Sequence, residues 1–144
     1  MNRRAAIAMS DAEVAAFLDE QRTLTCATIG PDAWPHLMPL WYVVRDGELW
    51  AWTYGKSQKV RNLERDSRCT LQVEAGETYD QLRGVMMKCV CAIHHEPEVV
   101  AGVGTELGAR YGGGHAVTTG QAAKRVALQF IVNHTASWDH RKLG

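Results

Sequence analysis

The stretch HLMPLWYVVRDGELWAWTY, residues 36–54, holds the pattern that decides the fold. It contains two runs rich in β-branched and aromatic residues, 36–44 and 48–54, with an Asp-Gly pair at 46–47 between them. An Asp-Gly pair flanked by such runs is typical of a tight β-hairpin. Pro39 cannot donate a ladder hydrogen bond, so we expect an edge, a bulge or a bound ligand at that point of the first strand.

Similar signals extend outward from this hairpin in both directions. On the N-terminal side, Ser10 and Glu13 form a capping box that begins a helix over 11–21. The elements expected elsewhere are a strand at 23–29 that ends in a Gly-Pro-Asp turn, a short helix at 56–66, strands at 69–74 and 82–94, a helix at 96–111, a strand at 126–132 and a polar tail at 134–144.

Consecutive hairpins with few helices predict a mostly β (α+β) fold, namely a closed or nearly closed antiparallel barrel with peripheral helices. The length of 144 residues suits a single domain over 1–144. Seven of the thirteen glycines lie between Gly102 and Gly120, which predicts a mobile loop near Gly112.

Composition narrows the class of protein. Sixteen basic residues balance sixteen acidic ones, and this zero net charge argues against nucleic-acid binding. The longest apolar run, 37–44, is less than half a membrane span, and residues 1–9 lack the apolar core of a secretory signal. The four cysteines lie in strand-like text without metal-ligand spacing, so we expect reduced, buried thiols and no metal. Together these features predict a cytoplasmic protein that does not associate with membranes.

The stretch 54–68 carries a local net charge of +3 in this neutral chain, from five basic and two acidic residues. A glycine ends a strand, Ser57 precedes the next helix, and Lys56 and Lys59 flank the first turn of that helix. Free N–H groups and the positive end of the dipole make a helix N-terminus a site for anions such as phosphate. The alternative interpretation is a solvated helix face whose lysines bind nothing specific.

Four tryptophans precede this basic turn, at positions 34, 41, 50 and 52. Such residues usually fill a core. A flat apolar wall beside a phosphate site is also what a planar ring cofactor with a phosphorylated tail requires. No catalytic triad, nucleophile elbow or carboxylate pair is evident in the sequence, so we expect a bound cofactor to carry any chemistry.

These residues resemble the pyridoxamine 5′-phosphate oxidase-like split β-barrel superfamily, and within it the flavin/deazaflavin oxidoreductases of the B group, which use coenzyme F-420. The likeness runs from Ser10 to Leu143. The motifs that carry it are LTCATIGPD at 24–32, WPHL at 34–37, WY at 41–42, KSQKVRNL at 56–63 and SWDHRKL at 137–143.

The resemblance implies a homodimer with two cofactor sites along the subunit interface. The cofactor phosphate would lie on Lys56, Ser57, Gln58 and Lys59, with Asn62 supporting that loop from the next turn. Met38, Pro39, Leu40 and Trp41 would run beside the ring, with Trp52 and Thr53 on the neighbouring strand. The tail around Trp138 and His140 would close the site, from the same or the other subunit.

The leading hypothesis is therefore a reductase that transfers a hydride from reduced F-420 to an unsaturated or conjugated small molecule. One alternative keeps the fold and uses FMN as an oxidase or reductase. A third possibility is a non-catalytic F-420 binding or carrier protein.

Overall fold

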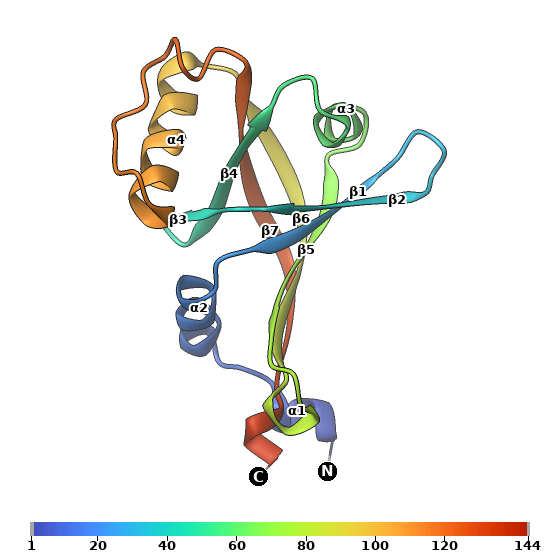
Figure 1. The fold of residues 1–144 in the computed structure, drawn as a ribbon. Coiled ribbons are helices and arrows are strands. Elements are labelled where there is room, and N and C mark those ends of the chain that lie inside the picture. Colours follow the sequence, from blue (N-terminus) through green and yellow to red (C-terminus); the bar gives the residue numbers. More distant parts are fainter. Residues whose placement is uncertain (1, 144) are drawn as a thin grey trace.

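The structure is a computed structural model and describes residues 2–143. Seven strands and four α-helices account for most of the chain (Figure 1). The strands are β1 Leu24–Ile29, β2 Pro35–Leu40, β3 Val43–Arg45, β4 Glu48–Tyr54, β5 Arg68–Ala75, β6 Arg83–His94 and β7 Arg125–Asp139. The helices are α1 Arg3–Ile7, α2 Asp11–Glu20, α3 Gln58–Arg65 and α4 Pro97–Tyr111, with 3₁₀ turns η1 Tyr79–Gln81 and η2 His140–Leu143.

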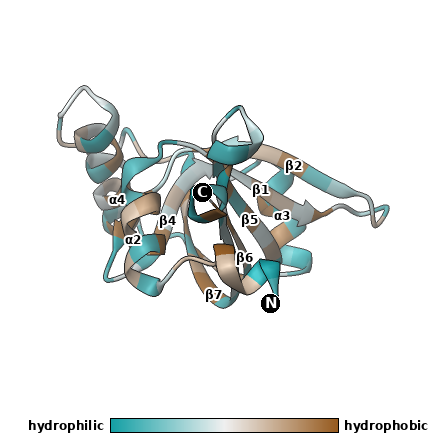
Figure 2. Ribbon diagram, turned by 90° about the horizontal axis from the view of Figure 1, so that it is seen from below, coloured by the Kyte–Doolittle hydropathy of each residue, from teal (hydrophilic) through white to brown (hydrophobic). Residues whose placement is uncertain are grey.

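All seven strands form one antiparallel sheet in the order β2-β1-β5-β6-β7-β4-β3. Strands β2 and β3 are the two edges of this sheet, yet only Trp41 and Tyr42 separate them along the chain. Because so short a link spans at most about 11 Å, the sheet must curl until its edges approach each other. This confirms the predicted split β-barrel with peripheral helices. Viewed from below, α2 and α4 lie on one side of the strands and α3 on the other (Figure 2).

The single strand predicted over 36–44 is wrong, because the run divides between two partners. Leu40 pairs with Leu24 of β1, whereas Val43 pairs with Trp50 of β4. Tyr42 is fully buried at the break, and its hydroxyl donates to the Leu18 carbonyl at 2.6 Å. Hydrophobic periodicity shows that such a run is extended but does not show where it changes neighbours.

The hairpin signal itself is confirmed. Asp46 and Gly47 both have positive φ, 50° and 80°, as a tight turn between two strands requires. The capping box of α2 is also present. The Ser10 hydroxyl accepts from the Glu13 amide at 3.2 Å, and Glu13 accepts from the Ser10 amide at 2.9 Å.

The last strand is longer than expected. The sequence predicts a strand at 126–132 followed by a polar tail, whereas β7 continues to Asp139 and pairs with β6 as far as Arg83. Asn133, His134 and Thr135 are exposed, so their polarity reflects contact with solvent rather than the end of strand pairing. A register shift at Lys88/Cys89 lets the long β6–β7 ribbon bend between the barrel and the chain termini.

Two clusters of apolar side chains stabilise this arrangement. The larger fills the barrel and includes all four cysteines. They are buried free thiols, as expected. The smaller lies where α4 packs on the outer face of β3, β4 and β7, through residues such as Val103 and Ala127. No helix within residues 2–143 is long and apolar enough to cross a membrane.

Candidate functional site: a cavity beside an unpaired lysine

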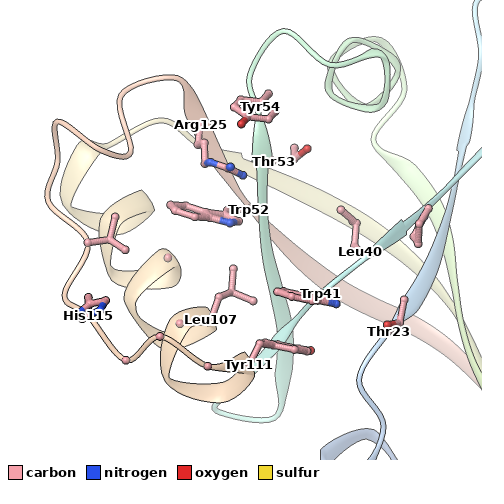
Figure 3. Close-up of a pocket in the computed structure, with 17 residues that line it drawn as sticks. Thr23, Leu40, Trp41, Trp52, Thr53, Tyr54, Leu107, Tyr111, His115 and Arg125 are labelled. Atoms are coloured by element: carbon pink, nitrogen blue, oxygen red, sulfur yellow. The ribbon is translucent and has the colours of Figure 1, made fainter.

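A cavity of about 630 Å³ opens between the barrel and α4. Its walls come from the β2–β3 link, the end of β4, the second half of α4, the glycine-rich loop that follows, and Arg125 at the start of β7 (Figure 3). Aromatic and aliphatic side chains make up most of the lining, and none of the lining residues is acidic. A second cavity, of about 600 Å³ beside β1, β5 and β6, is lined by none of the residues expected to bind the cofactor.

The aromatic wall follows from strand alternation and one glycine. The side chains of β4 alternate, so Trp50 and Trp52 share one face while Leu49, Ala51 and Thr53 are buried on the other. Gly104 of α4 lies against Trp52, and a Cβ there would approach the indole to 2.3 Å. Only glycine therefore lets the helix pack against this ring.

Trp41 and Tyr111 build the opposite part of the wall. Their rings stack with centroids 4.4 Å apart and an interplanar angle of 3°. The Tyr111 hydroxyl accepts from the Tyr42 amide at 3.1 Å, which ties the end of α4 to the β2–β3 link. The stack thus holds a flat, apolar surface at the point where the edges of the sheet meet.

Lys59 is the most unusual charge in this region. Its side chain is buried, with the residue only 8% exposed, and Nζ donates to Thr53 Oγ1 at 2.9 Å. No carboxylate in residues 2–143 lies within 4.0 Å of this ammonium group. Burial lowers the pKa of Lys59, because desolvation disfavours the charged form. A buried cation without a counter-ion is costly, and this favours a role in binding an anion.

Ser57 supplies a second unsatisfied group at the same corner. It occupies the N-cap position of α3, but its hydroxyl makes no capping hydrogen bond. The Oγ atom is buried and has no hydrogen-bond partner within the described chain. A buried hydroxyl normally has a partner, so the corner fits an anionic group such as the phosphate of a cofactor.

Asn62 anchors α3 to the barrel. It is fully buried, donates to Thr28 Oγ1 at 3.0 Å, and accepts from Gln58 Nε2 at 2.8 Å. These contacts fix the helix whose first turn carries Ser57 and Lys59. Lys56 is exposed just before them, where its charge faces solvent.

Most of the residues expected at the site from the sequence are neighbours in the fold. Pro39, Leu40, Trp41, Trp52 and Thr53 line the cavity. Met38 is exposed on β2 next to them. The residues expected to hold the phosphate, 56–59, follow β4 directly but do not line the cavity. Lys59 reaches its edge only through the hydrogen bond to Thr53, which does line it.

Trp138 and His140 lie elsewhere in the chain. They are at the end of β7 and in η2, beside the termini and opposite the end that carries α3 and α4 (Figure 1). Trp138 covers Gly84, where a Cβ would approach its ring to 2.1 Å, and His140 packs edge-on against Tyr79. Within one chain these two residues do not reach the cavity, so their expected role requires a second subunit and stays a prediction.

Sequence reasoning missed the α4 side of the cavity. Leu107, Tyr111, His115 and Arg125 line it together with the glycine loop. No local motif marks these positions, because their proximity to β4 arises only when α4 folds back onto the sheet. The one available signal was the glycine cluster, and Gly112, Gly113 and Gly114 line the cavity with positive φ values.

Comparison with known proteins places this geometry in a family. Residues 10–139 match the family described as pyridoxamine 5′-phosphate oxidase. The chain belongs to that family. It is thus a member of a group of flavin-type oxidoreductases, as the sequence motifs suggested.

Solved structures support the same assignment. A conserved hypothetical protein from Mycobacterium tuberculosis is 47% identical, with a TM-score of 0.91 over 100% of this chain and 93% of that one. An F420 reductase shares 20% identity and a TM-score of 0.70, covering 84% of this chain and 94% of its own. A FAD-binding protein from Mesorhizobium loti shares 16% identity and a TM-score of 0.68, covering 90% and 94%. The last two show the common fold. No curated protein matches the chain.

Proposed function

We propose that this protein is an F-420-dependent oxidoreductase that reduces an unsaturated or conjugated small molecule. The observation that carries the proposal is the buried ammonium group of Lys59, which lacks a carboxylate partner and is hydrogen-bonded to Thr53 on the cavity wall. A ligand with an anionic group and a planar apolar ring system would pair its charge with the corner at residues 56–59 and fill the cavity with its ring.

The corner would hold the cofactor phosphate. Lys59 provides a desolvated positive charge, Ser57 a hydroxyl without a partner, and the first turn of α3 its free N–H groups. Asn62 keeps the helix in place through Thr28. Because Asn62 fixes the helix that carries these groups, less conformational freedom would be lost when they bind an anion.

The cavity would hold the ring. Trp41 and Trp52 offer apolar surface, and Pro39 exposes strand backbone that has one donor fewer. When bound, the deazaflavin supplies hydride transfer at C5, and the protein contributes orientation and exclusion of water. The Tyr54 hydroxyl lines the same cavity and is exposed to solvent, so it or water would deliver the proton to the product.

The proposal includes a homodimer. The edge strand β2 and the turn before it expose Trp34, Leu37 and Met38, with Trp34 74% exposed. Large apolar side chains on an edge strand are a liability unless another surface covers them. A second copy of the chain would cover this edge, and light scattering should give twice the mass of one chain.

Titration of the purified protein with F-420 and, separately, with FMN tests the cofactor. We expect a saturable change in F-420 fluorescence, with FMN binding more weakly. Tight FMN binding without an F-420 response would replace the proposal by the FMN alternative. F-420 binding without oxidation of the reduced form by any of a panel of enones and quinones would indicate a carrier.

A further inference from the structure

Arg125 at the start of β7 has an unusual environment. Its Cζ atom lies 4.3 Å from the ring centroid of Trp52 and 4.2 Å from that of Tyr54. These two residues project from the same side of β4, and Tyr54 is the register partner of Arg125. Figure 3 shows the guanidinium group between the two rings at the cavity wall. Stacking of this kind uses the faces of the guanidinium plane and leaves its N–H edge free for hydrogen bonds in the plane.

The side-chain donors of Arg125 have no acceptor among residues 2–143. In the part of the chain that the structure describes, its side chain makes no hydrogen bond and no ion pair within 4.0 Å. Arg45 is the informative contrast, because it stacks on the neighbouring Trp50 at 4.9 Å and also pairs with Glu106 at 2.6 Å. Arg110 is likewise stacked, on Tyr42, and donates to several backbone carbonyls. Arg125 is half-buried and lines the cavity. Its guanidinium group therefore borders open space, whereas Arg45 and Arg110 contact acceptor atoms of the protein.

The surroundings of Arg125 indicate what would bind there. Leu107, Val117 and the Trp41–Tyr111 stack make the α4 side of the cavity apolar and flat, and no acidic residue lines it. A planar body would pack against these surfaces, while an anionic group would accept from the guanidinium edge. The planar fork of arginine matches a carboxylate in two parallel hydrogen bonds.

We infer that the α4 side of this cavity is a binding site for planar conjugated carboxylates, with Arg125 as the residue that recognises the acid group. The inference rests on the proposed function in one respect, because it names the substrate class of that reductase as unsaturated acids. The same guanidinium could instead meet an anionic group of the cofactor tail. The two sources share their chemistry, and the experiment separates them.

Calorimetric titration of the protein without cofactor uses cinnamate and its neutral isostere cinnamamide as probes. We expect cinnamate to bind the wild type about tenfold more tightly than cinnamamide, since one charged hydrogen-bonded pair distinguishes them. Arg125→Gln should abolish that preference, and Arg125→Lys should keep part of it through charge alone. Lys124→Gln is the matched control, because it removes one positive charge from the adjacent exposed position and should leave the preference intact.

Several results would overturn the inference. These are equal affinity for the two probes, no binding of either, or the same loss in Lys124→Gln as in Arg125→Gln. Thermal unfolding shows whether the glutamine variant is folded. If it is not, a reduced but remaining preference in a folded Arg125→Lys supports the inference. An unchanged preference in that lysine variant would then count against bidentate recognition.

Titration of the same variants with F-420 separates the two sources of the anion. If Arg125→Gln weakens F-420 binding and leaves cinnamate binding unchanged, the arginine serves the cofactor tail and the substrate assignment is wrong. If the wild type fails to bind F-420 but binds cinnamate through Arg125, the proposed function fails and the carboxylate site stands.

Discussion

The two ends of the molecule differ in whether their least exposed cations are paired, although ion pairs such as Arg45–Glu106 also occur beside α4. At the end that carries the termini, acidic and basic side chains are matched at short distance. The pairs are Asp139–Arg141 at 2.8 Å, Glu13–Lys142 at 2.8 Å and Glu20–Arg83 at 3.1 Å. At the end that carries α3 and α4, Lys59 is buried and Arg125 half-buried, and within residues 2–143 neither has an anionic partner.

This contrast indicates which end is built for stability and which for a ligand. Paired charges satisfy each other whether or not anything binds. An unpaired buried cation raises the free energy of the folded state, so its presence favours a function that outweighs the cost. Three predictions test the contrast, beginning with the largest effect.

Lys59→Met should have the largest effect, as a loss of F-420 binding without a loss of stability. Removing a charged hydrogen-bond donor should weaken F-420 binding by about 1.5–3 kcal/mol, which is at least about tenfold. The free energy of unfolding without ligand should stay equal or rise, because the variant no longer buries an unpaired charge. Fluorescence titration and urea denaturation measure the two quantities.

Arg61→Gln is the control for that variant. It removes one positive charge from an exposed position on the same helix and should leave F-420 affinity nearly unchanged. If Lys59→Met bound F-420 as tightly as the wild type, or if both variants lost affinity equally, the corner would not be a specific phosphate site.

Gly84→Ala should act at the other end and on stability. The added methyl group would meet the Trp138 ring at 2.1 Å, so the ring or the β6–β7 ribbon must move. Overpacking of this kind should lower the free energy of unfolding by about 1–3 kcal/mol. An unchanged denaturation midpoint would show that Trp138 is not packed as described. Affinity for F-420 in the same variant shows whether the displaced tail also contributes to a partner subunit's site.

Asp139→Asn should have the smallest effect, and it should depend on pH. Arg141 holds the pKa of Asp139 below its usual value through hydrogen bonds to the carboxylate. Because the folded-state pKa is the lower one, the pair stabilises the protein above the unfolded pKa near 4 and is lost as pH falls through the folded value. The variant should therefore be less stable than the wild type at pH 7, by less than about 1 kcal/mol, and the difference should vanish in acid. A difference that stays constant from pH 7 to pH 2 would contradict this assignment.

Much of the fold could be predicted because its signals are local. The Asp46-Gly47 turn and the Ser10 capping box each act within a few positions, and both appear as expected. The runs of β-branched residues are extended as expected, although two of them have other bounds than predicted. The break at Trp41 and the extension of β7 to Asp139 could not be predicted, because they depend on which strand lies alongside.

The candidate site divides in the same way. The proposed phosphate corner follows directly in the sequence from β4 to α3, so residues 54–59 already indicate it. The burial of Lys59 without a counter-ion and the position of Arg125 between Trp52 and Tyr54 are visible only in three dimensions. The sequence shows that these basic residues are present, but it does not show whether an acidic side chain lies beside them in the fold.

The short Trp41–Tyr42 link joins the two edge strands of the barrel, β2 and β3, and the cavity lies beside this link. A molecule bound against Trp41 would hold the two edge strands together, because it contacts the point where the chain crosses from one edge of the sheet to the other. A ligand that binds only when β2 and β3 are in place disfavours their local opening by mass action. Ligand should therefore slow amide hydrogen exchange in β2 and β3 more than in the central strands.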